Sequence, residues 1–145
     1  MLLKEQRELV VEYGKRLVEA ELTVGTFGNL SVYDREQDLM AISPSGMDYF
    51  ATDPEDVVVL TLQGRQVEGT RQPSIEADLH CLLYQNREDV NAVIHPHSTY
   101  TTVLACLHWP IPPSIIWSPT RAGRSPVFPT IPLDPWSWPR LPGTP

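Results

Sequence analysis

The chain has 145 residues, of which 41% are hydrophobic, and carries a formal net charge of −7. This length suits one domain with a real core, and the negative charge disfavours nucleic acid and anionic membranes as partners. The early charged residues and the absence of a long apolar run disfavour a signal peptide and a membrane span. Two cysteines without a secretion signal, Cys81 and Cys106, indicate reduced thiols in the cytoplasm, and both are expected to be core residues.

The first predicted element is an amphipathic helix over residues 4–22. Leu9, Tyr13, Leu17 and Ala20 recur at helical spacing, and charged residues lie between them. We expect these four side chains to pack against the core.

Two small polar loops and a series of strands follow the helix. The first loop, residues 24–31, leads into strands predicted over 30–33 and 39–42, and the second loop, residues 43–46, follows directly. Exposed backbone N–H groups beside hydroxyl and amide side chains suit a phosphate, although an ordinary turn explains either loop separately. Two such loops allow one anion to be held from two sides.

A β-branched apolar run over residues 57–62 predicts an interior strand, and residues 65–67 return after the turn at Gly64. The segment Pro73-Ser74-Ile75-Glu76 then opens a helix, with Ser74 placed as its cap. The buried stripe of this helix is expected to consist of Ile75, Leu79, Leu82 and Leu83.

Glu76 lies in the first turn of that helix, where a carboxylate complements the helix dipole. A general acid/base or a metal ligand is the functional alternative.

The apolar run from Ala92 to Ile94 predicts a buried strand that ends in two histidines, His95 and His97. Residues two apart in an extended chain point to the same side, and Pro96 keeps the preceding residue extended. Both imidazoles can therefore converge on one point as a metal half-site suited to zinc, whereas two solvated histidines at a strand end are the alternative. Residues 98–106 are predicted to form another helix.

Four motifs in this order resemble the class II aldolase/adducin family over residues 1–113. They are Gly25-Thr26-Phe27-Gly28-Asn29-Leu30-Ser31, Ile42-Ser43-Pro44-Ser45-Gly46-Met47, Pro73-Ser74-Ile75-Glu76 and His95-Pro96-His97-Ser98. The resemblance implies a three-layer α/β/α sandwich with a central, mainly antiparallel sheet, C-terminally truncated in this chain. It also implies a homotetramer with the active site near a subunit interface.

The family's functional residues map onto these motifs. His95 and His97 would bind one zinc ion, and Glu76 would be the catalytic acid/base and, in some states, a further metal ligand. The phosphate of a phosphorylated sugar would be held by Thr26, Gly28, Asn29, Ser45, Gly46 and Ser74.

The activity implied by the resemblance is zinc-dependent aldol cleavage. A sugar phosphate such as L-fuculose 1-phosphate would yield dihydroxyacetone phosphate and an aldehyde, with zinc as Lewis acid and Glu76 moving the proton. Glutamate at this position resembles the aldolases, because the related epimerases more often carry aspartate. A related epimerase or dehydratase, and a non-catalytic aldolase-like remnant, are the alternatives.

Three features depart from the family pattern. Ile75 replaces the second of two serines, and Pro96 stands between the histidines. The family's third zinc histidine lies well downstream, whereas the last histidine here is His108, so an impaired activity is expected.

Residues 114–145 are predicted to be an irregular tail, because they hold eight of the 15 prolines and three of the four tryptophans. Possible codons from Ser114 onward can be read, in another frame, as a C-terminal motif of the family. Our hypothesis is a frameshifted tail, and a divergent proline-rich tail is the alternative; the encoding DNA decides between them.

Overall fold

A computed structural model describes residues 1–109. The predicted irregular tail and its frameshift, residues 114–145, lie outside the described residues. Residues 1–97 belong to one compact unit, and a second unit begins at Ser98. Among the described residues, no helix is long and apolar enough to cross a membrane.

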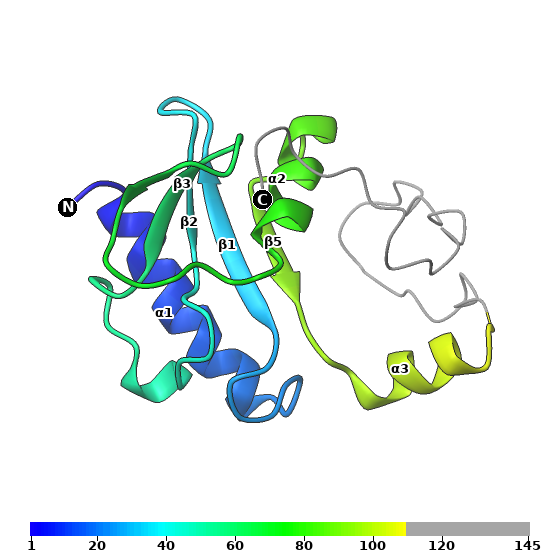
Figure 1. The fold of residues 1–145 in the computed structure, drawn as a ribbon. Helices are drawn as coiled ribbons and strands as arrows, with labels where there is room; N and C mark the ends of the chain where they lie inside the picture. The colour runs from blue at the N-terminus through cyan, green and yellow to red at the C-terminus, as the bar shows by residue number, and fades with distance from the viewer. Residues whose placement is uncertain (110–145) are drawn as a thin grey trace. The chain divides into compact units, whose positions relative to one another are not determined.

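Five strands form one antiparallel sheet in the order β4-β3-β2-β1-β5 (Figure 1). Their bounds are β1 Asn29–Asp34, β2 Leu39–Ile42, β3 Val58–Thr61, β4 Gln66–Glu68 and β5 Ala92–His95. The hairpin of β1 and β2 is confirmed, and β3 is the predicted interior strand, with Val58, Val59 and Leu60 buried.

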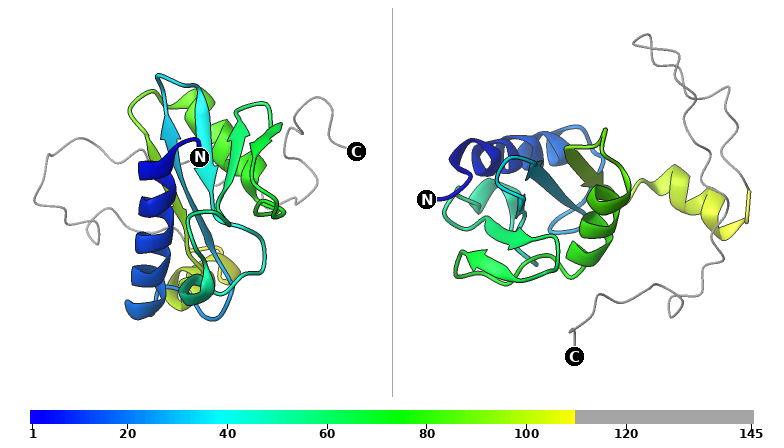
Figure 2. Two further views of the ribbon diagram at one scale, coloured as in Figure 1. Left: turned by 90° about the vertical axis from the view of Figure 1, so that its left-hand side faces the viewer. Right: turned by 90° about the horizontal axis from the view of Figure 1, so that it is seen from above.

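Two helices cover the two faces of this sheet. Alternate strand residues point to opposite faces. Leu30, Ala41 and Val59 pack with Val10 of helix α1 (Lys4–Glu19), whereas Met40, Ile42, Val58 and Leu60 pack with Cys81 and Tyr84 of helix α2 (Ala77–Asn86). Figure 2 shows α1 along one side of the strands. The predicted three-layer α/β/α architecture is therefore present.

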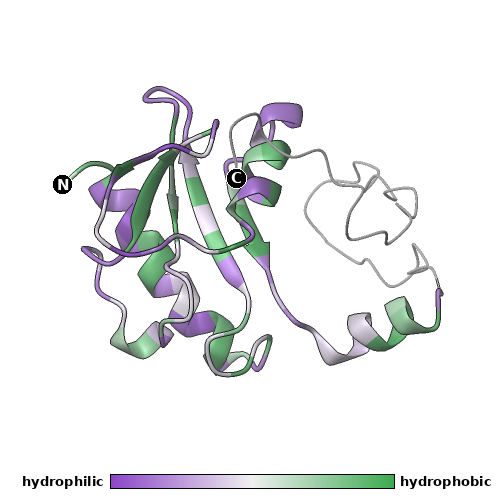
Figure 3. Cartoon of the chain, viewed as in Figure 1, coloured by the Kyte–Doolittle hydropathy of each residue, from purple (hydrophilic) through white to green (hydrophobic). Residues whose placement is uncertain are grey.

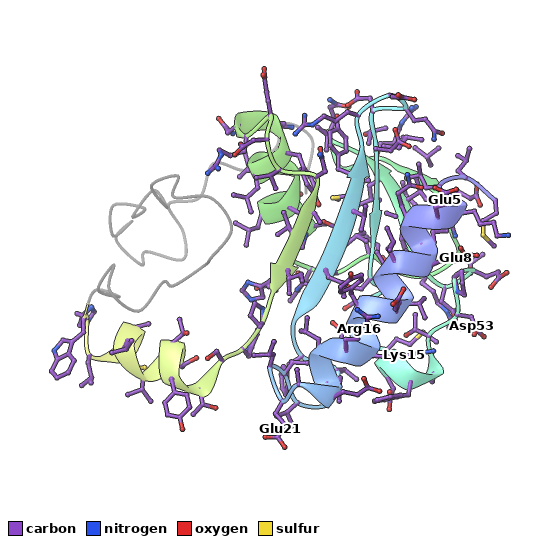
Figure 4. The ribbon with its side chains drawn as sticks, turned by 180° about the vertical axis from the view of Figure 1, so that it is seen from behind. Glu5, Glu8, Lys15, Arg16, Glu21 and Asp53 are labelled. Atoms are coloured by element: carbon purple, nitrogen blue, oxygen red, sulfur yellow. The ribbon has the colours of Figure 1, made fainter. Side chains whose placement is uncertain are left out.

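Helix α1 is where it was expected, but its buried face is not the predicted one. Leu17 is buried, whereas Leu9, Tyr13 and Ala20 are exposed. The inward stripe instead consists of Leu3, Arg7, Val10, Gly14 and Leu17. A search for apolar periodicity misses it, because an arginine and a glycine occupy two of the inward positions. Figure 4 shows Glu5, Glu8 and Arg16 along the outer side of this helix.

The predicted stripe of α2 is wrong for a related reason. Ile75 is 91% exposed because the helix begins only at Ala77, and Leu79, Leu82 and Leu83 are half-buried. The buried positions are Ala77, His80, Cys81 and Tyr84. Two of these four inward side chains, His80 and Tyr84, carry polar groups.

Strand β5 is an edge strand of the described sheet, not the buried strand that was predicted. It pairs with β1 alone within residues 1–109, and Ile94 is 47% exposed. Figure 3 shows the hydrophobic colouring of this strand. The second unit contains helix α3 (Thr99–Cys106), as predicted. Cys81 is buried as expected, but Cys106 is exposed, so its assignment to the core was wrong.

Arg7 is a charged side chain within the core and is 1% exposed. Its guanidinium donates to the carbonyl oxygens of Leu2 at 2.9 Å and Pro54 at 3.1 Å, and to Oε1 of Glu68 at 2.9 Å. Arg7 thus joins the start of the chain to the loop before β3 and to β4.

Arg7→Met should lower the free energy of unfolding by about 3 kcal/mol, because it removes the guanidinium that donates to two carbonyl groups and to Oε1 of Glu68. Urea denaturation measures this loss. The exposed Arg65 provides the matched control, since Arg65→Met should change the free energy by less than about 0.5 kcal/mol. Equal effects of the two substitutions would contradict the role assigned to Arg7.

Candidate metal and substrate site

Glu76, His95 and His97 lie together in the first unit. His95 Nε2 is 3.3 Å from Oε1 of Glu76 and 3.3 Å from Nε2 of His97. One ligand atom from each of the three residues lies within 4.8 Å of the other two. Two convergent imidazoles and a carboxylate form a donor set for a transition metal.

Strand pairing and a loop position the two histidines. His95 is the last residue of β5 and lies opposite Asn29 of β1, so the two side chains share a face of the sheet. His97 follows after Pro96, and its ring stacks on Phe27 with centroids 5.7 Å apart. Both rings are therefore held close to the loop that precedes β1.

The donor set fits zinc. In a tetrahedral site with zinc–nitrogen bonds of about 2.0–2.1 Å, neighbouring ligand atoms are about 3.3–3.4 Å apart. The two separations that involve His95 are both 3.3 Å. These three side chains can therefore supply three donors to one ion.

Asn29 connects the sheet to Glu76. It is 5% exposed, and its amide nitrogen donates to Oε2 of Glu76. The sequence analysis expected Asn29 to hold a phosphate, and the contact with Glu76 was not foreseen. One N–H of the amide is thus directed at the carboxylate.

The second polar loop is joined to the segment that precedes α2. Ser45 N–H donates to the carbonyl of Gln72 at 2.9 Å, and Ser74 N–H donates to the carbonyl of Ser43 at 3.1 Å. The hydroxyl of Ser74 accepts from the N–H of Glu76 at 3.2 Å, which differs from the predicted cap because the helix starts later. Ser74 is buried beside Glu76, while Ser45 and Gly46 are exposed.

The first polar loop passes close to the end of β5. Gly28 has φ +74°, and a Cβ added there would lie 2.7 Å from the carbonyl oxygen of His95. The hydroxyl of Tyr49 donates to the carbonyl of Gly28 at 2.9 Å and so also holds this loop. Thr26 is exposed at the same loop, and no hydrogen bond of its side chain joins it to the other predicted phosphate ligands within residues 1–109.

A chain of buried hydrogen bonds extends from Asn29 into the core. His80 Nε2 lies 2.6 Å from Oδ1 of Asn29, and its Nδ1 lies 2.6 Å from Oγ of Ser31. That hydroxyl is 2.7 Å from the hydroxyl of Tyr84. Sequence reasoning missed this network, although His80 and Tyr84 of α2, and Glu76 just before it, recur every four residues and so lie on one side.

The sequence matches a known family over most of its length. Residues 8–137 match the family described as the class II aldolase and adducin N-terminal domain. The chain belongs to this family. The match extends past residue 113, where the sequence resemblance was expected to end.

Two curated proteins, one named as an aldolase and one as an epimerase, are among those similar to this chain. A 5-deoxy-D-ribulose 1-phosphate aldolase from Bacillus thuringiensis serovar kurstaki is 52% identical over 112 residues, which cover 77% of this chain and 53% of the relative. An L-ribulose-5-phosphate 4-epimerase UlaF from Salmonella paratyphi B is 34% identical over 110 residues, covering 76% and 48%. The chain thus spans about half the length of the curated relatives it matches.

Solved structures agree with the family fold. A structure described as L-fuculose 1-phosphate aldolase superimposes with a TM-score of 0.75 at 52% identity, covering 79% of this chain and 54% of that one. YgbL from Klebsiella pneumoniae, described as a putative aldolase/epimerase/decarboxylase, gives a TM-score of 0.68 at 30% identity, covering 77% and 53%. The described fold is therefore that of the class II aldolases.

Within this class II aldolase fold, His80 is a neutral ring. Burial is the main cause that lowers the pKa of His80 to about 4 from 6.5, and the charge of His95 adds to it. The unfolded chain therefore binds a proton at pH values where the folded chain does not. A fall in pH from about 6.5 towards 4 accordingly favours unfolding.

Between pH 7 and pH 5, His80 should lower the free energy of unfolding by about 2 kcal/mol. Urea denaturation of the unaltered protein and of His80→Gln at both pH values isolates this contribution, because all other titrating groups are common to both proteins. The variant should lose about 2 kcal/mol less than the unaltered protein over this range. The same pH dependence in both proteins would show that His80 is not the titrating group.

Proposed function

We propose that this chain acts as a zinc-dependent sugar-phosphate aldolase, which cleaves a phosphorylated ketose into dihydroxyacetone phosphate and an aldehyde. The convergence of Glu76, His95 and His97 beside the two polar loops is the observation that carries the proposal. Two relatives at 52% identity support it, because their names describe aldolases of sugar 1-phosphates.

Three side chains of this protein would hold the metal. His95 and His97 would each donate Nε2, and Glu76 would donate Oε1. When bound, zinc supplies the Lewis acidity that stabilises negative charge on a substrate oxygen. Glu76 would thus be the third of the protein ligands that the described residues bring together.

Glu76 would also act as the general acid/base that transfers a proton to or from the substrate. Its side chain is 35% exposed, so a substrate can reach it, while Asn29 holds the other carboxylate oxygen. With its other oxygen held by Asn29, Oε1 would bind the metal in some states and act as the general acid/base in others.

The substrate phosphate would bind at the two polar loops. Ser45 and Gly46 are exposed on the second loop and Thr26 on the first. Asn29 and Ser74 are hydrogen-bonded to Glu76, and Gly28 lies beside the His95 carbonyl. Backbone N–H groups in such loops bind anions without requiring a charged side chain. This arrangement would place the phosphate at one end of the substrate and the reacting carbon near Glu76.

The double substitution His95→Ala with His97→Ala should abolish stoichiometric zinc binding, because it removes two of three protein ligands. Elemental analysis of purified, dialysed protein measures the zinc content. His108→Ala is the matched control, since His108 is an exposed histidine outside the cluster, and it should leave the content unchanged. Retention of zinc by the double variant would place the metal elsewhere.

An epimerase is the second candidate, because the UlaF epimerase is 34% identical to this chain. The reaction product separates the candidates. The zinc-loaded protein should release dihydroxyacetone phosphate, slowly, from L-fuculose 1-phosphate or 5-deoxy-D-ribulose 1-phosphate, and Glu76→Gln should reduce the rate at least about 100-fold. A dehydrogenase-coupled assay detects this product.

The other outcomes of this assay would contradict an aldolase. Epimerisation of L-ribulose 5-phosphate without release of dihydroxyacetone phosphate would favour the epimerase. A protein that binds zinc but turns over neither class of substrate would be a non-catalytic member of the family.

A further inference from the structure

A continuous line of hydrogen bonds joins the core of the protein to Glu76. It runs from Tyr84 through Ser31, His80 and Asn29. Ser31 is 1% exposed, His80 is 0% exposed and Tyr84 is 2% exposed, so water does not compete for these bonds. Within residues 1–109 the only end of this line that reaches the surface is the Glu76 carboxylate.

Each bond in the line has a fixed direction. The ionised Glu76 carboxylate only accepts, so Asn29 must turn its amide nitrogen towards it and its Oδ1 towards His80. His80 Nε2 must then carry the proton, which leaves Nδ1 to accept from the hydroxyl of Ser31. The Tyr84 hydroxyl then donates to Ser31, whose Oγ lies 2.7 Å and whose carbonyl oxygen lies 3.1 Å from it.

This directionality selects one orientation of the Asn29 amide. A rotation of the amide by about 180° would set its oxygen against the Glu76 carboxylate and its N–H groups against the N–H of His80. Both ends of the amide therefore oppose the rotation. Loss of His80 would remove one of these two restraints and leave the amide held by Glu76 alone.

We propose that His80 is a positioning residue that, with Ser31 and Tyr84, fixes the Asn29 amide and thereby aims the Glu76 carboxylate at His95 and His97. This inference rests on the proposed metal site. Among the described residues, the hydrogen bonds of the His80 ring go to Asn29 and Ser31 and not to Glu76, His95 or His97, so it would act through Asn29. Hydrogen-bond partners that orient a ligand in this way commonly contribute about 10- to 100-fold to metal affinity.

Three variants of α2 test the proposal in the full chain. His80→Leu removes both ring nitrogens, whereas His80→Gln keeps an N–H donor directed towards Asn29. Cys81→Ala is the control, because Cys81 is also 0% exposed on α2 but has no hydrogen bond to the network. The zinc dissociation constant is measured by competition with a chromophoric chelator, and the side-chain amide signals of Asn29 are followed by NMR in the metal-free protein.

His80→Leu should weaken zinc binding about 10- to 100-fold and shift the Asn29 amide signals. His80→Gln and Cys81→Ala should stay within about threefold of the unaltered protein. In an Asn29→Ala background, His80→Leu should have no further effect, because the route through the amide is already broken. An Asn29→Ala effect that adds fully to that of His80→Leu would overturn the proposal, as would a folded His80→Leu variant with unchanged affinity and unchanged amide signals.

The two readouts separate this inference from the proposed function. If the unaltered chain binds no zinc at Glu76, His95 and His97, the proposed function fails. The NMR signals of Asn29 then still decide whether His80 orients the amide, because they are recorded without metal. Unperturbed signals in His80→Leu would refute the positioning role on their own.

Discussion

The antiparallel pairing of β1 with β5 is the constraint on which the site depends. It sets Asn29 opposite His95, and side chains opposite one another in a sheet lie on the same face. A slip of one residue would turn His95 to the face covered by α1 and separate it from Glu76. The position of His95, one of the proposed metal ligands, is therefore fixed by the register of these two strands.

Gly28 makes this pairing possible at the point where β1 begins. The chain arrives there with a positive φ and passes so close to the His95 carbonyl that a side chain would not fit. The glycine was expected to serve a phosphate. Its surroundings add a second requirement for glycine, because the loop passes directly beside the end of β5.

The strands and the second unit's helix could be predicted from sequence because their signals are local. The apolar run of β3 and the hairpin of β1 and β2 follow from side-chain type and turn residues. The inward faces of α1 and α2 could not be predicted by the same rule. Arg7 and His80 are buried with hydrogen-bond partners, and Gly14 is buried against the Tyr49 ring, but hydrophobic periodicity counts none of the three.

The histidine pair could be anticipated from the two-residue repeat of an extended strand, and Glu76 from its motif. The bond between Asn29 and Glu76 could not, because it joins residues 47 positions apart whose approach depends on the sheet register. The same holds for the contact of Ser31 with His80. These long-range hydrogen bonds explain why α2 can bury the polar side chain of His80 against the sheet.

X-ray absorption spectroscopy of the zinc-loaded protein tests the central claim most directly, because it reports the atoms around the metal. The account predicts a shell of nitrogen and oxygen at about 2.0–2.2 Å with the scattering pattern of two imidazoles. A sulfur shell at about 2.3 Å would indicate a cysteine ligand. Such a shell, or one without two imidazoles, would contradict a site built from Glu76, His95 and His97.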